Sequence, residues 1–360
     1  MTFHAFRQKS LDLLSREWLF FIALLGLIVT SSWLGRLPTL HWGELEPIWL
    51  LWGLFVAIRG IERSHLLCRV GRLMEWLPAP GISLVVLGFV LGMFLTIDVA
   101  LVTLVPIIFS MNLRGRIRVL LLASFAAHAG AALLPFGTPQ NLFIYYHFRP
   151  GLVEFVRAIA PLSFGLMGLF LLAGAFGGVS IGKPIRRSEP KPLLKITALL
   201  YLLFFFLVAA AVLGLLSPGI TLLPLLYAWF FDEESLKVDY FLLLTFVVFL
   251  ALATNVRIMV APWLHKGEDI FLLSTLLSQV ISNVPATLLL EPITTHWRSL
   301  LWGTNVGGFG TPVAALANLI LIRLYRSHAG TTKDFIKPFW LANIPVLLFG
   351  AALYYALRHL

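Results

Sequence analysis

Residues 80–111, PGISLVVLGFVLGMFLTIDVALVTLVPIIFSM, decide how the rest of the chain is organised. They hold two apolar runs, and the second, 99–111, would be about 20 Å long as a helix. A hydrocarbon core is about 30 Å thick, so this run is too short to cross it. Asp98 lies at the junction of the two runs. We therefore predict a re-entrant helical hairpin that turns near Thr96-Ile97-Asp98 and returns to the side from which it entered.

The basic residues on both sides of this hairpin support the prediction. Arginines are concentrated at 59–72, before it, and at 114–118, after it. Short loops rich in Lys and Arg remain in the cytoplasm, so both flanks belong there. On this topology, with the amino terminus inside, 20 of the 27 Lys and Arg residues lie on the cytoplasmic side. A conventional double crossing at 80–111 would weaken that bias.

The composition indicates a membrane protein along the whole length of the chain. Hydrophobic residues make up 59% and charged residues only 12%, whereas soluble domains carry about 25% charged residues. The net charge of +10 is explained by basic loops rather than by nucleic-acid binding. We expect an all-α polytopic, multi-pass protein of the bacterial inner membrane, surrounded by lipid, with a cytoplasmic amino terminus and no nucleic-acid partner.

A basic segment rich in proline divides the chain into two parts. The predicted parts are a first membrane repeat (1–178, with hairpin 80–111 and broken helix 117–148), a basic cytoplasmic linker (179–195), and a second membrane repeat with an extra linking span (196–360, with hairpin 270–293 and broken helix 299–324).

The two parts are related in sequence. Residues 128–135 align without gaps with 305–312, and Asn141 aligns with Asn318 at the same offset. One extra span, 193–213, lies between the copies, so the second copy is expected to be inverted. Two inverted repeats, each with a re-entrant hairpin and a broken helix, are typical of secondary transporters.

The hairpin tips supply the first candidate site residues. A carboxylate within an apolar stretch is costly, so Asp98 is by default a functional-site candidate. The alternative is that Asp98 caps a helical arm starting at Val99. The inverted copy of this tip falls at Ser282-Asn283-Val284-Pro285. Ser and Asn can cap an arm that begins at Pro285, and their oxygens and the freed carbonyls can bind Na⁺.

The interruptions of the long apolar runs supply the others. Gly137-Thr138-Pro139 interrupts 117–148, and Gly310-Thr311-Pro312 interrupts 299–324. Such residues free backbone groups that must find partners inside the protein, although a simple packing kink is the alternative. His128 is a histidine deep in a predicted span. It is either a hydrogen-bonded core residue or a group that titrates during transport.

The complete candidate set contains no catalytic residue. The predicted substrate- and ion-binding residues are Thr96, Asp98, His128, Gly137, Thr138, Asn141, Ser282, Asn283, Asn305, Gly310, Thr311 and Asn318. A Na⁺ site is predicted near Ser282, Asn283, Asn305 and Gly310. No HExxH or paired metal-ligand motif occurs, so we expect no enzyme and no cofactor other than Na⁺ or H⁺ as coupling ion.

These motifs together resemble the ion transporter superfamily, which includes arsenite permease-like proteins, citrate symporters and sodium-coupled divalent anion symporters. The residues that carry the resemblance are Asp98-Val-Ala-Leu with Pro106, Gly137-Thr-Pro-Gln-Asn141, Ser282-Asn-Val-Pro285, Gly303-Thr-Asn305-Val-Gly-Gly308 and Leu316-Ala-Asn318. The resemblance covers most of 80–325 and implies that two hairpin tips and two unwound helices enclose substrate and cations. The resemblance is also compatible with a homodimer.

This chain departs from the superfamily pattern in its first half. Ile97 stands where relatives usually have Asn, and His128 stands where Asn is expected. Both differences remove a neutral oxygen ligand, which leaves proton coupling through Asp98 as an alternative to a first-half sodium site.

The functional prediction is a secondary active transporter for a small anionic solute, coupled to Na⁺ or H⁺. The preference for an anion rests on the resemblance and on helix-end dipoles, since no binding arginine is evident. The alternatives are a cation–proton antiporter, a membrane-embedded enzyme and a channel. The absence of metal and nucleophile motifs disfavours the enzyme, and the broken inverted repeats disfavour the channel.

Overall fold

The computed structural model describes residues 17–64, 80–111, 113, 115–176, 196–260 and 267–358. The linker 179–195 therefore lies outside the described residues. Helices of the first half are α2 (Trp18–Leu34), α3 (Trp42–Arg63), α5 (Pro80–Phe94), α6 (Ile97–Ser110), α7 (Arg116–Ala131), α8 (Pro139–Phe148) and α9 (Leu152–Phe176). Helices of the second half are α10 (Ile196–Val212), α11 (Leu222–Phe231), α12 (Tyr240–Val260), α13 (Gly267–Ile281), α14 (Asn283–Leu290), α15 (Trp297–Gly307), α16 (Leu316–Ala329) and α17 (Lys333–Leu357). Short 3₁₀ turns are η1 (Pro218–Thr221), η2 (Glu233–Leu236) and η4 (Glu291–Ile293). The all-α class is confirmed for this part of the chain.

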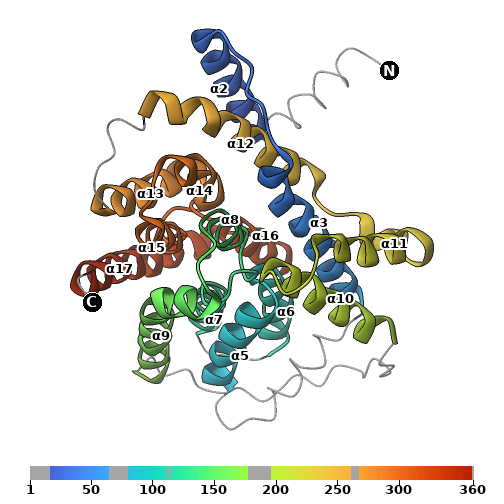
Figure 1. Ribbon diagram of the computed structural model, residues 1–360. Coiled ribbons are helices and arrows are strands. Elements are labelled where there is room, and N and C mark those ends of the chain that lie inside the picture. Colours follow the sequence, from blue (N-terminus) through green and yellow to red (C-terminus); the bar gives the residue numbers. More distant parts are fainter. Residues whose placement is uncertain are drawn as a thin grey trace, which may run out of the picture.

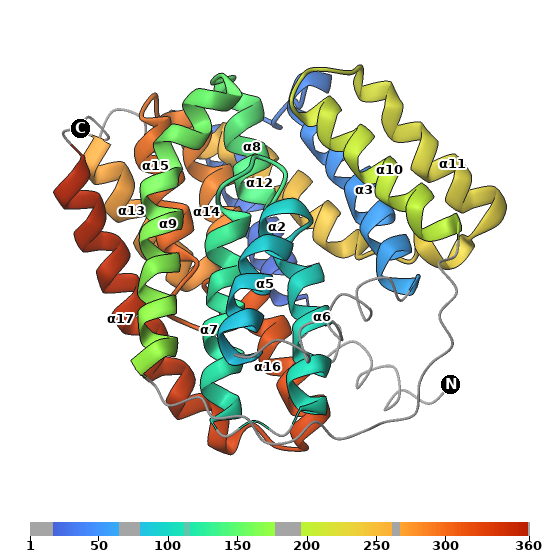
Figure 2. The same cartoon turned by 90° about the horizontal axis from the view of Figure 1, so that it is seen from below.

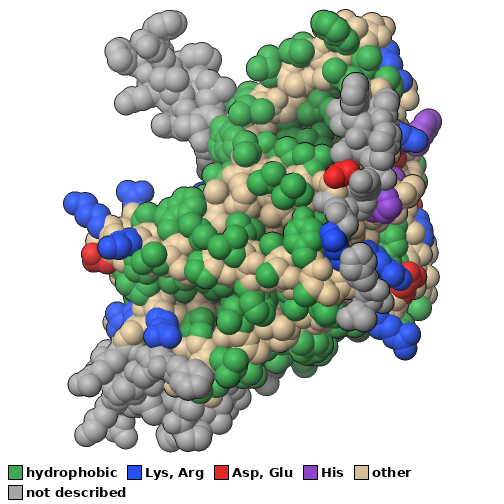
Figure 3. Space-filling model, turned by 90° about the vertical axis from the view of Figure 1, so that its left-hand side faces the viewer, with side chains coloured by type: hydrophobic (Ala, Val, Ile, Leu, Met, Phe, Trp, Pro, Cys, Tyr) green, Lys and Arg blue, Asp and Glu red, His purple; other side chains and the backbone are tan. Residues whose placement is uncertain are grey.

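The surface and the helix lengths fit a membrane protein. Three helical stretches are long and apolar enough to cross a bilayer by length and composition, namely Leu152–Ala175, Glu233–Met259 and Lys333–Leu357. Several shorter apolar helices accompany them. Figure 3 shows Lys, Arg, Asp and Glu side chains mainly at two opposite edges, with a largely hydrophobic band between them. This distribution is the one expected for a protein surrounded by lipid.

The helices form two groups that are each built from both halves of the sequence (Figure 1). One group pairs α2 with α12 and α3 with α10, and α11 packs beside α3. The other contains both helical hairpins, the four segments α7, α8, α15 and α16, and the long helices α9 and α17. Several helices of this second group run roughly parallel in the view of Figure 2. The segments predicted to carry function thus lie together in the second group.

Each predicted hairpin is a pair of short helices joined at a tight turn. Leu95 and Thr96 connect α5 to α6, and Ser282 alone connects α13 to α14. With 15 and 14 residues, α5 and α6 are about 22 and 21 Å long, shorter than a hydrocarbon core. The second arms begin earlier than predicted, at Ile97 rather than Val99 and at Asn283 rather than Pro285. The re-entrant path of each hairpin through the membrane stays a prediction.

The first arm of each hairpin packs directly on a broken helix, α5 on α7 and α13 on α15. The approach of α5 to α7 is so close that a Cβ atom on Gly92 would lie 2.0 Å from the carbonyl oxygen of Ala127. Small residues that let helix backbones come together are a common packing device in membranes. The hairpin arm is therefore held against the helix whose interruption helps to form the central site.

The two broken helices are interrupted at corresponding places. The chain leaves helical geometry between α7 and α8, at 132–138, and between α15 and α16, at 308–315. An asparagine in the first turn after each break binds the end of the helix before it. Asn141 Nδ2 donates to Ala132 O at 2.8 Å, and Asn318 Nδ2 donates to Gly308 O at 3.0 Å. These bonds satisfy carbonyl groups that the interruption has freed. The inverted relation of the two halves stays a prediction.

These bonds give a stability prediction. Asn141→Ala and Asn318→Ala should each lower the unfolding midpoint of the purified protein. Each substitution leaves a buried carbonyl without its partner, which costs about 1–3 kcal/mol. The matched control is Ser327→Ala, because the Ser327 hydroxyl is exposed and contacts only its own helix, at Leu324 O and His328 Nδ1. Equal midpoints for all three variants would show that the asparagines do not hold the breaks together.

Labelling can test the membrane orientation. In a Cys68→Ser background, we expect Arg118→Cys to react with an impermeant maleimide only from the cytoplasm and His296→Cys only from outside. Both side chains are exposed, and Arg118 lies in the first turn of α7 whereas His296 directly precedes α15. Reaction of residue 118 from the outside would contradict the predicted cytoplasmic flank of the first hairpin.

Candidate functional site

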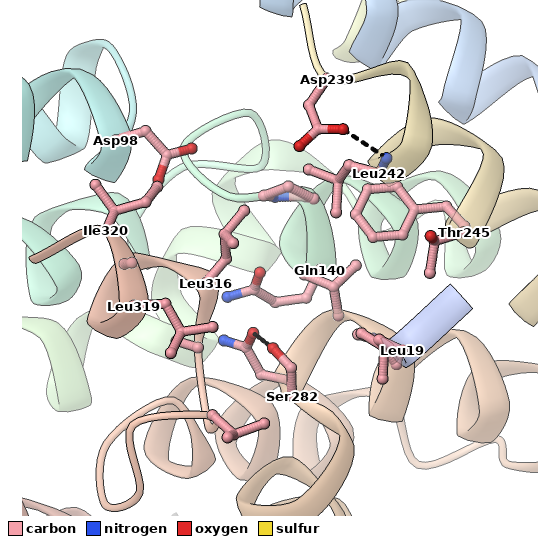
Figure 4. A pocket seen from close by; sticks show the side chains of 18 of the residues that line it. Leu19, Asp98, Gln140, Asp239, Leu242, Thr245, Ser282, Leu316, Leu319 and Ile320 are labelled. Carbon is pink, nitrogen blue, oxygen red and sulfur yellow. Dashed lines mark hydrogen bonds between the residues drawn. The ribbon is translucent and has the colours of Figure 1, made fainter. Parts of the chain in front are cut away.

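A cavity of about 200 Å³ lies where both hairpins and both broken helices meet. Four helices, α6, α8, α14 and α16, begin at its wall. The residues of their first turns that line it are Ile97, Asp98, Pro139, Gln140, Asn283, Val284, Pro285, Leu316 and Ala317. Figure 4 shows the side chains of Asp98, Gln140 and Ser282 around this space, with Leu316 and Leu319 between the first hairpin and the second.

Three of the four helices that start at the cavity have no side-chain cap. No capping hydrogen bond is formed by Thr138 before α8, by Ser282 before α14 or by Ala315 before α16. The first N–H groups of a helix have no acceptor within the helix, and its amino end carries a partial positive charge. The cavity thus collects several uncapped positive helix ends, an arrangement that suits an anionic group.

At the first hairpin tip, the capping residue is Thr96 and not Asp98. Thr96 Oγ1 accepts a hydrogen bond from the Val99 N–H at 3.5 Å, and Asp98 lies in the first turn of α6. The alternative interpretation of Asp98 as the cap is therefore wrong. The Asp98 side chain is half-buried, lines the cavity, and forms no hydrogen bond or ion pair with the described residues. Its carboxylate is available to a proton, a cation or a solute.

The second hairpin tip is a strained single-residue turn. Ser282 has φ +76°, a conformation that non-glycine residues rarely adopt. The predicted capping by Ser282 is wrong, because its hydroxyl instead contacts Asn283 Oδ1 at 3.5 Å. The tip is fixed to the second break by a bond from the Asn283 N–H to Ala314 O at 2.9 Å. Strain of this kind is often concentrated at ligand-binding sites, and both tip residues line the cavity.

His128 of α7 reaches across to the second broken helix. Its ring lies 4.6 Å from that of Phe309, measured between centroids. A methyl group on Gly308 would lie 2.6 Å from His128 Nε2 and 3.0 Å from Asn283 Nδ2, so the absence of a side chain there lets both groups approach. His128 is buried, and its Nε2 has no hydrogen-bond partner. The buried hydroxyl of Thr138, which also lines the cavity, likewise has none.

The remaining predicted residues lie outside the cavity lining. Asn305 Nδ2 donates to Asn141 Oδ1 at 2.8 Å, which joins the two broken helices, and Asn305 Oδ1 has no partner. Thr311 N–H donates to Gln279 Oε1 at 2.9 Å, next to Gly310. Thr96 caps α6, Gly137 lies in the first break and Asn318 binds the second.

The four predicted Na⁺ ligands therefore do not all lie at the cavity. Ser282 and Asn283 line the cavity, whereas Asn305 and Gly310 do not. Among the described residues, no group of three or more His, Cys, Asp or Glu side chains could hold a metal ion. The Na⁺ site stays a prediction.

Two glutamines complete the arrangement and were missed from the sequence. Gln140 is buried in the first turn of α8, lines the cavity and forms no hydrogen bond with the described residues. Gln279 of α13 donates to the carbonyls of Gly307 at 2.8 Å and Phe309 at 3.0 Å, so it holds the second break in place. The position of Gln140 beside the Gly-Thr-Pro interruption is the one signal that could have identified it.

The cavity lining also contains charged residues. Glu17, Asp239 and Arg323 all line it. Asp239 also caps α12, since its Oδ1 accepts the Leu242 N–H at 3.0 Å. The charge count places the segments of these residues near the cytoplasmic side. On the predicted topology, this charged part of the lining is expected on the cytoplasmic side.

Two hairpins and two interrupted helices around one cavity, in an apolar helical protein, define a membrane transporter. The comparisons agree: the sequence pattern of the citrate transporter family matches residues 13–297, and the chain belongs to that family. It is 30% identical to "Uncharacterized transporter MJ0456" of Methanocaldococcus jannaschii, over 85% of this chain and 88% of the relative. It is 32% identical to "Inner membrane protein YbiR" of Escherichia coli, over 87% of each chain. The superfamily resemblance is confirmed, and the protein is a transporter rather than an enzyme.

Proposed function

We propose that the protein is a secondary active transporter of the inner membrane that moves a small anionic solute together with H⁺ or Na⁺. The observation that carries this proposal is the convergence of four helix amino ends, three of them uncapped, on one cavity. Unpartnered groups of His128, Thr138 and Gln140 at the same cavity offer further hydrogen bonds. Helix amino ends with convergent donors are a general way of binding an anion without a lysine or arginine.

Asp98 supplies the coupling in this proposal. It lies in the first turn of α6 and lines the cavity. An ionised carboxylate about 6 Å from a bound anion would repel it by about 3 kcal/mol at an effective dielectric constant of 20. That repulsion corresponds to a loss of affinity of about 100-fold. Binding of H⁺ or Na⁺ to Asp98 removes the penalty, so the anion and the cation bind together.

A cation–proton antiporter remains the second candidate because the described lining of the cavity holds more carboxylates than lysine or arginine side chains. Among the described residues, Asp98, Asp239 and Glu17 line it, against one arginine, Arg323. In that case Asp98 would bind the transported cation directly. The two candidates differ in whether an anion binds in the cavity.

A ligand screen tests the proposal. The unfolding midpoint of the purified protein is measured with small carboxylates, inorganic oxyanions and monovalent cations at pH 6 and pH 8. We expect one class of anion to raise the midpoint, more strongly at pH 6 or with Na⁺ present. Gln140→Leu should reduce this effect, and Ser327→Ala should retain it. Stabilisation by a cation alone, with no anion effective, would contradict the proposal and favour the antiporter.

A further inference from the structure

A second cavity, of about 530 Å³, lies away from the transport site between the ends of α6, α7 and α16. Its lining residues are Phe109, Gly115, Arg116, Ile117, Tyr325, His328 and Ala329. The charge count places residues 114–118 and 323–337 in the cytoplasm. The cavity therefore lies, on this topology, near the cytoplasmic surface of the membrane.

Arg116 brings a positive charge into this cavity that has no negative partner among the described residues. Its guanidinium lies 5.3 Å from the centroid of the Phe109 ring and donates one hydrogen bond, to Met111 O at 3.2 Å. Its Nε is buried and has no hydrogen-bond partner. Arg116 forms no ion pair with any described carboxylate, including Asp334, whose charge acts on the neighbouring Tyr325. Buried donors in proteins nearly always have a hydrogen-bond acceptor, so a ligand that supplies an acceptor would explain this unpaired Nε.

Two side chains of α16 add donors of different kinds. The Tyr325 side chain is only 7% exposed, and its hydroxyl forms no hydrogen bond with the described residues. His328 Nδ1 lies 2.9 Å from Leu324 O and 3.1 Å from the Ser327 hydroxyl. His328 Nε2 forms no hydrogen bond with the described residues, so it is the ring nitrogen left for a ligand.

The backbone adds a fourth element. Helix α7 begins here after Gly115, which has φ +74° and provides no side-chain cap. The first N–H groups of α7 therefore have no acceptor in the helix and lie beside the guanidinium of Arg116. A planar guanidinium, an imidazole, a phenol and an uncapped helix amino end form a donor set that suits a phosphate group.

We propose that this cavity, formed by Arg116, Tyr325, His328 and the amino end of α7, binds a phosphate-bearing anion. The bound group would connect α6, the second arm of the first hairpin, with α7 and α16, which belong to the two broken helices. Two sources share this chemistry: the headgroup of an anionic phospholipid in the cytoplasmic leaflet and a soluble phosphate or phosphate ester. Basic pockets between membrane helices on the cytoplasmic side are known to take lipid headgroups.

The test measures binding rather than transport, so its result is independent of the proposed function. The purified full-length protein is delipidated and titrated in separate arms. One arm adds phosphatidylglycerol or, for comparison, phosphatidylcholine, and the other adds inorganic phosphate or chloride at equal ionic strength. Binding is followed by the unfolding midpoint and by native mass spectrometry. The variants are Arg116→Gln, Tyr325→Phe and the control Arg326→Gln, which removes the same charge from exposed α16 surface outside the cavity.

We expect phosphatidylglycerol or inorganic phosphate to bind the wild-type protein, and the arm that responds identifies the source. Arg116→Gln should weaken that binding about tenfold or more, since it removes charge-assisted hydrogen bonds. Tyr325→Phe should weaken that binding less. Because it removes only a hydroxyl group, it still tests the site if Arg116→Gln does not fold. Arg326→Gln should bind like wild type. Equal affinity of Arg116→Gln and wild type, or an equal loss in Arg326→Gln, would overturn the proposal and leave only diffuse attraction to a basic surface.

Discussion

Asp98→Asn is expected to abolish gradient-driven accumulation of the solute while the protein still folds and reaches the membrane. Asn cannot take up a proton and carries no charge with which to hold Na⁺. The helix cap is unaffected because Thr96, and not Asp98, caps α6. The variant should therefore bind the anion without its cation and allow only equilibration across the membrane.

The expected size of the effect follows from the driving force. A gradient of one pH unit corresponds to about 1.4 kcal/mol per proton, or about tenfold accumulation. In proteoliposomes with that gradient, or with an equivalent Na⁺ gradient, the wild-type protein should approach about tenfold accumulation for one coupled ion, and Asp98→Asn should remain near onefold. The control is Asp239→Asn, which lines the same cavity and can still cap α12. If Asp98→Asn kept the gradient dependence, Asp98 would not be the residue that couples the ion to transport.

Gly308→Ala is expected to abolish transport for a steric reason. The added methyl group would lie 2.4 Å from His128 Cε1 and 3.0 Å from Asn283 Nδ2. Atoms cannot approach so closely, so the imidazole or the tip of the second hairpin must move. Because both lie at the central cavity, we expect solute uptake to fall by about 100-fold, the loss that a misplacement of about 1 Å can cause at a site of this kind.

The matched control is Gly168→Ala in α9, where an added Cβ atom would meet nothing within 4 Å. It should transport solute like the wild-type protein. The double variant Gly308→Ala with His128→Ala removes the imidazole clash, so it should recover thermal stability relative to Gly308→Ala. Normal uptake by Gly308→Ala alone would show that the contact between His128 and the second break has no role in transport.

The elements of the site were predictable because their signals are local in the sequence. The short run after Asp98, the Ser-Asn-Val-Pro segment at 282–285 and the Gly-Thr-Pro interruptions each break an apolar pattern. The observed helices start and stop at these places. Loop charge adds a prediction of the side of the membrane, which hydropathy alone does not provide and which stays a prediction.

The first residue of each second arm was less predictable. Thr96 and Asp98 are both good capping residues, so the sequence alone allows α6 to begin at Ile97 or at Val99. The choice depends on how tightly the hairpin turns against α7, which is a tertiary effect. At the other tip, Ser282 is held at φ +76° by its surroundings, so its hydroxyl does not reach the position of a cap.

Side-chain partners between distant segments could not be predicted. Asn141 and Asn305 were both expected to bind ions, yet Asn305 donates to Asn141 and joins the two broken helices. Gln279 lies in an apolar run without any local motif, and its role appears only when α13 packs against the second break. Such assignments depend on which helices meet, which sequence spacing within one helix does not reveal.

In the proposed mechanism an anion and a cation enter the cavity together, coupled by Asp98. The most direct measurement follows anion entry and internal pH, or internal Na⁺, in the same proteoliposomes. We expect that entry of the anion identified by the ligand screen brings in H⁺ or Na⁺ at a fixed ratio, and that Asp98→Asn loses the cation entry but keeps slow anion entry. Anion entry by the wild-type protein with no accompanying H⁺ or Na⁺, or cation exchange without any anion, would contradict it.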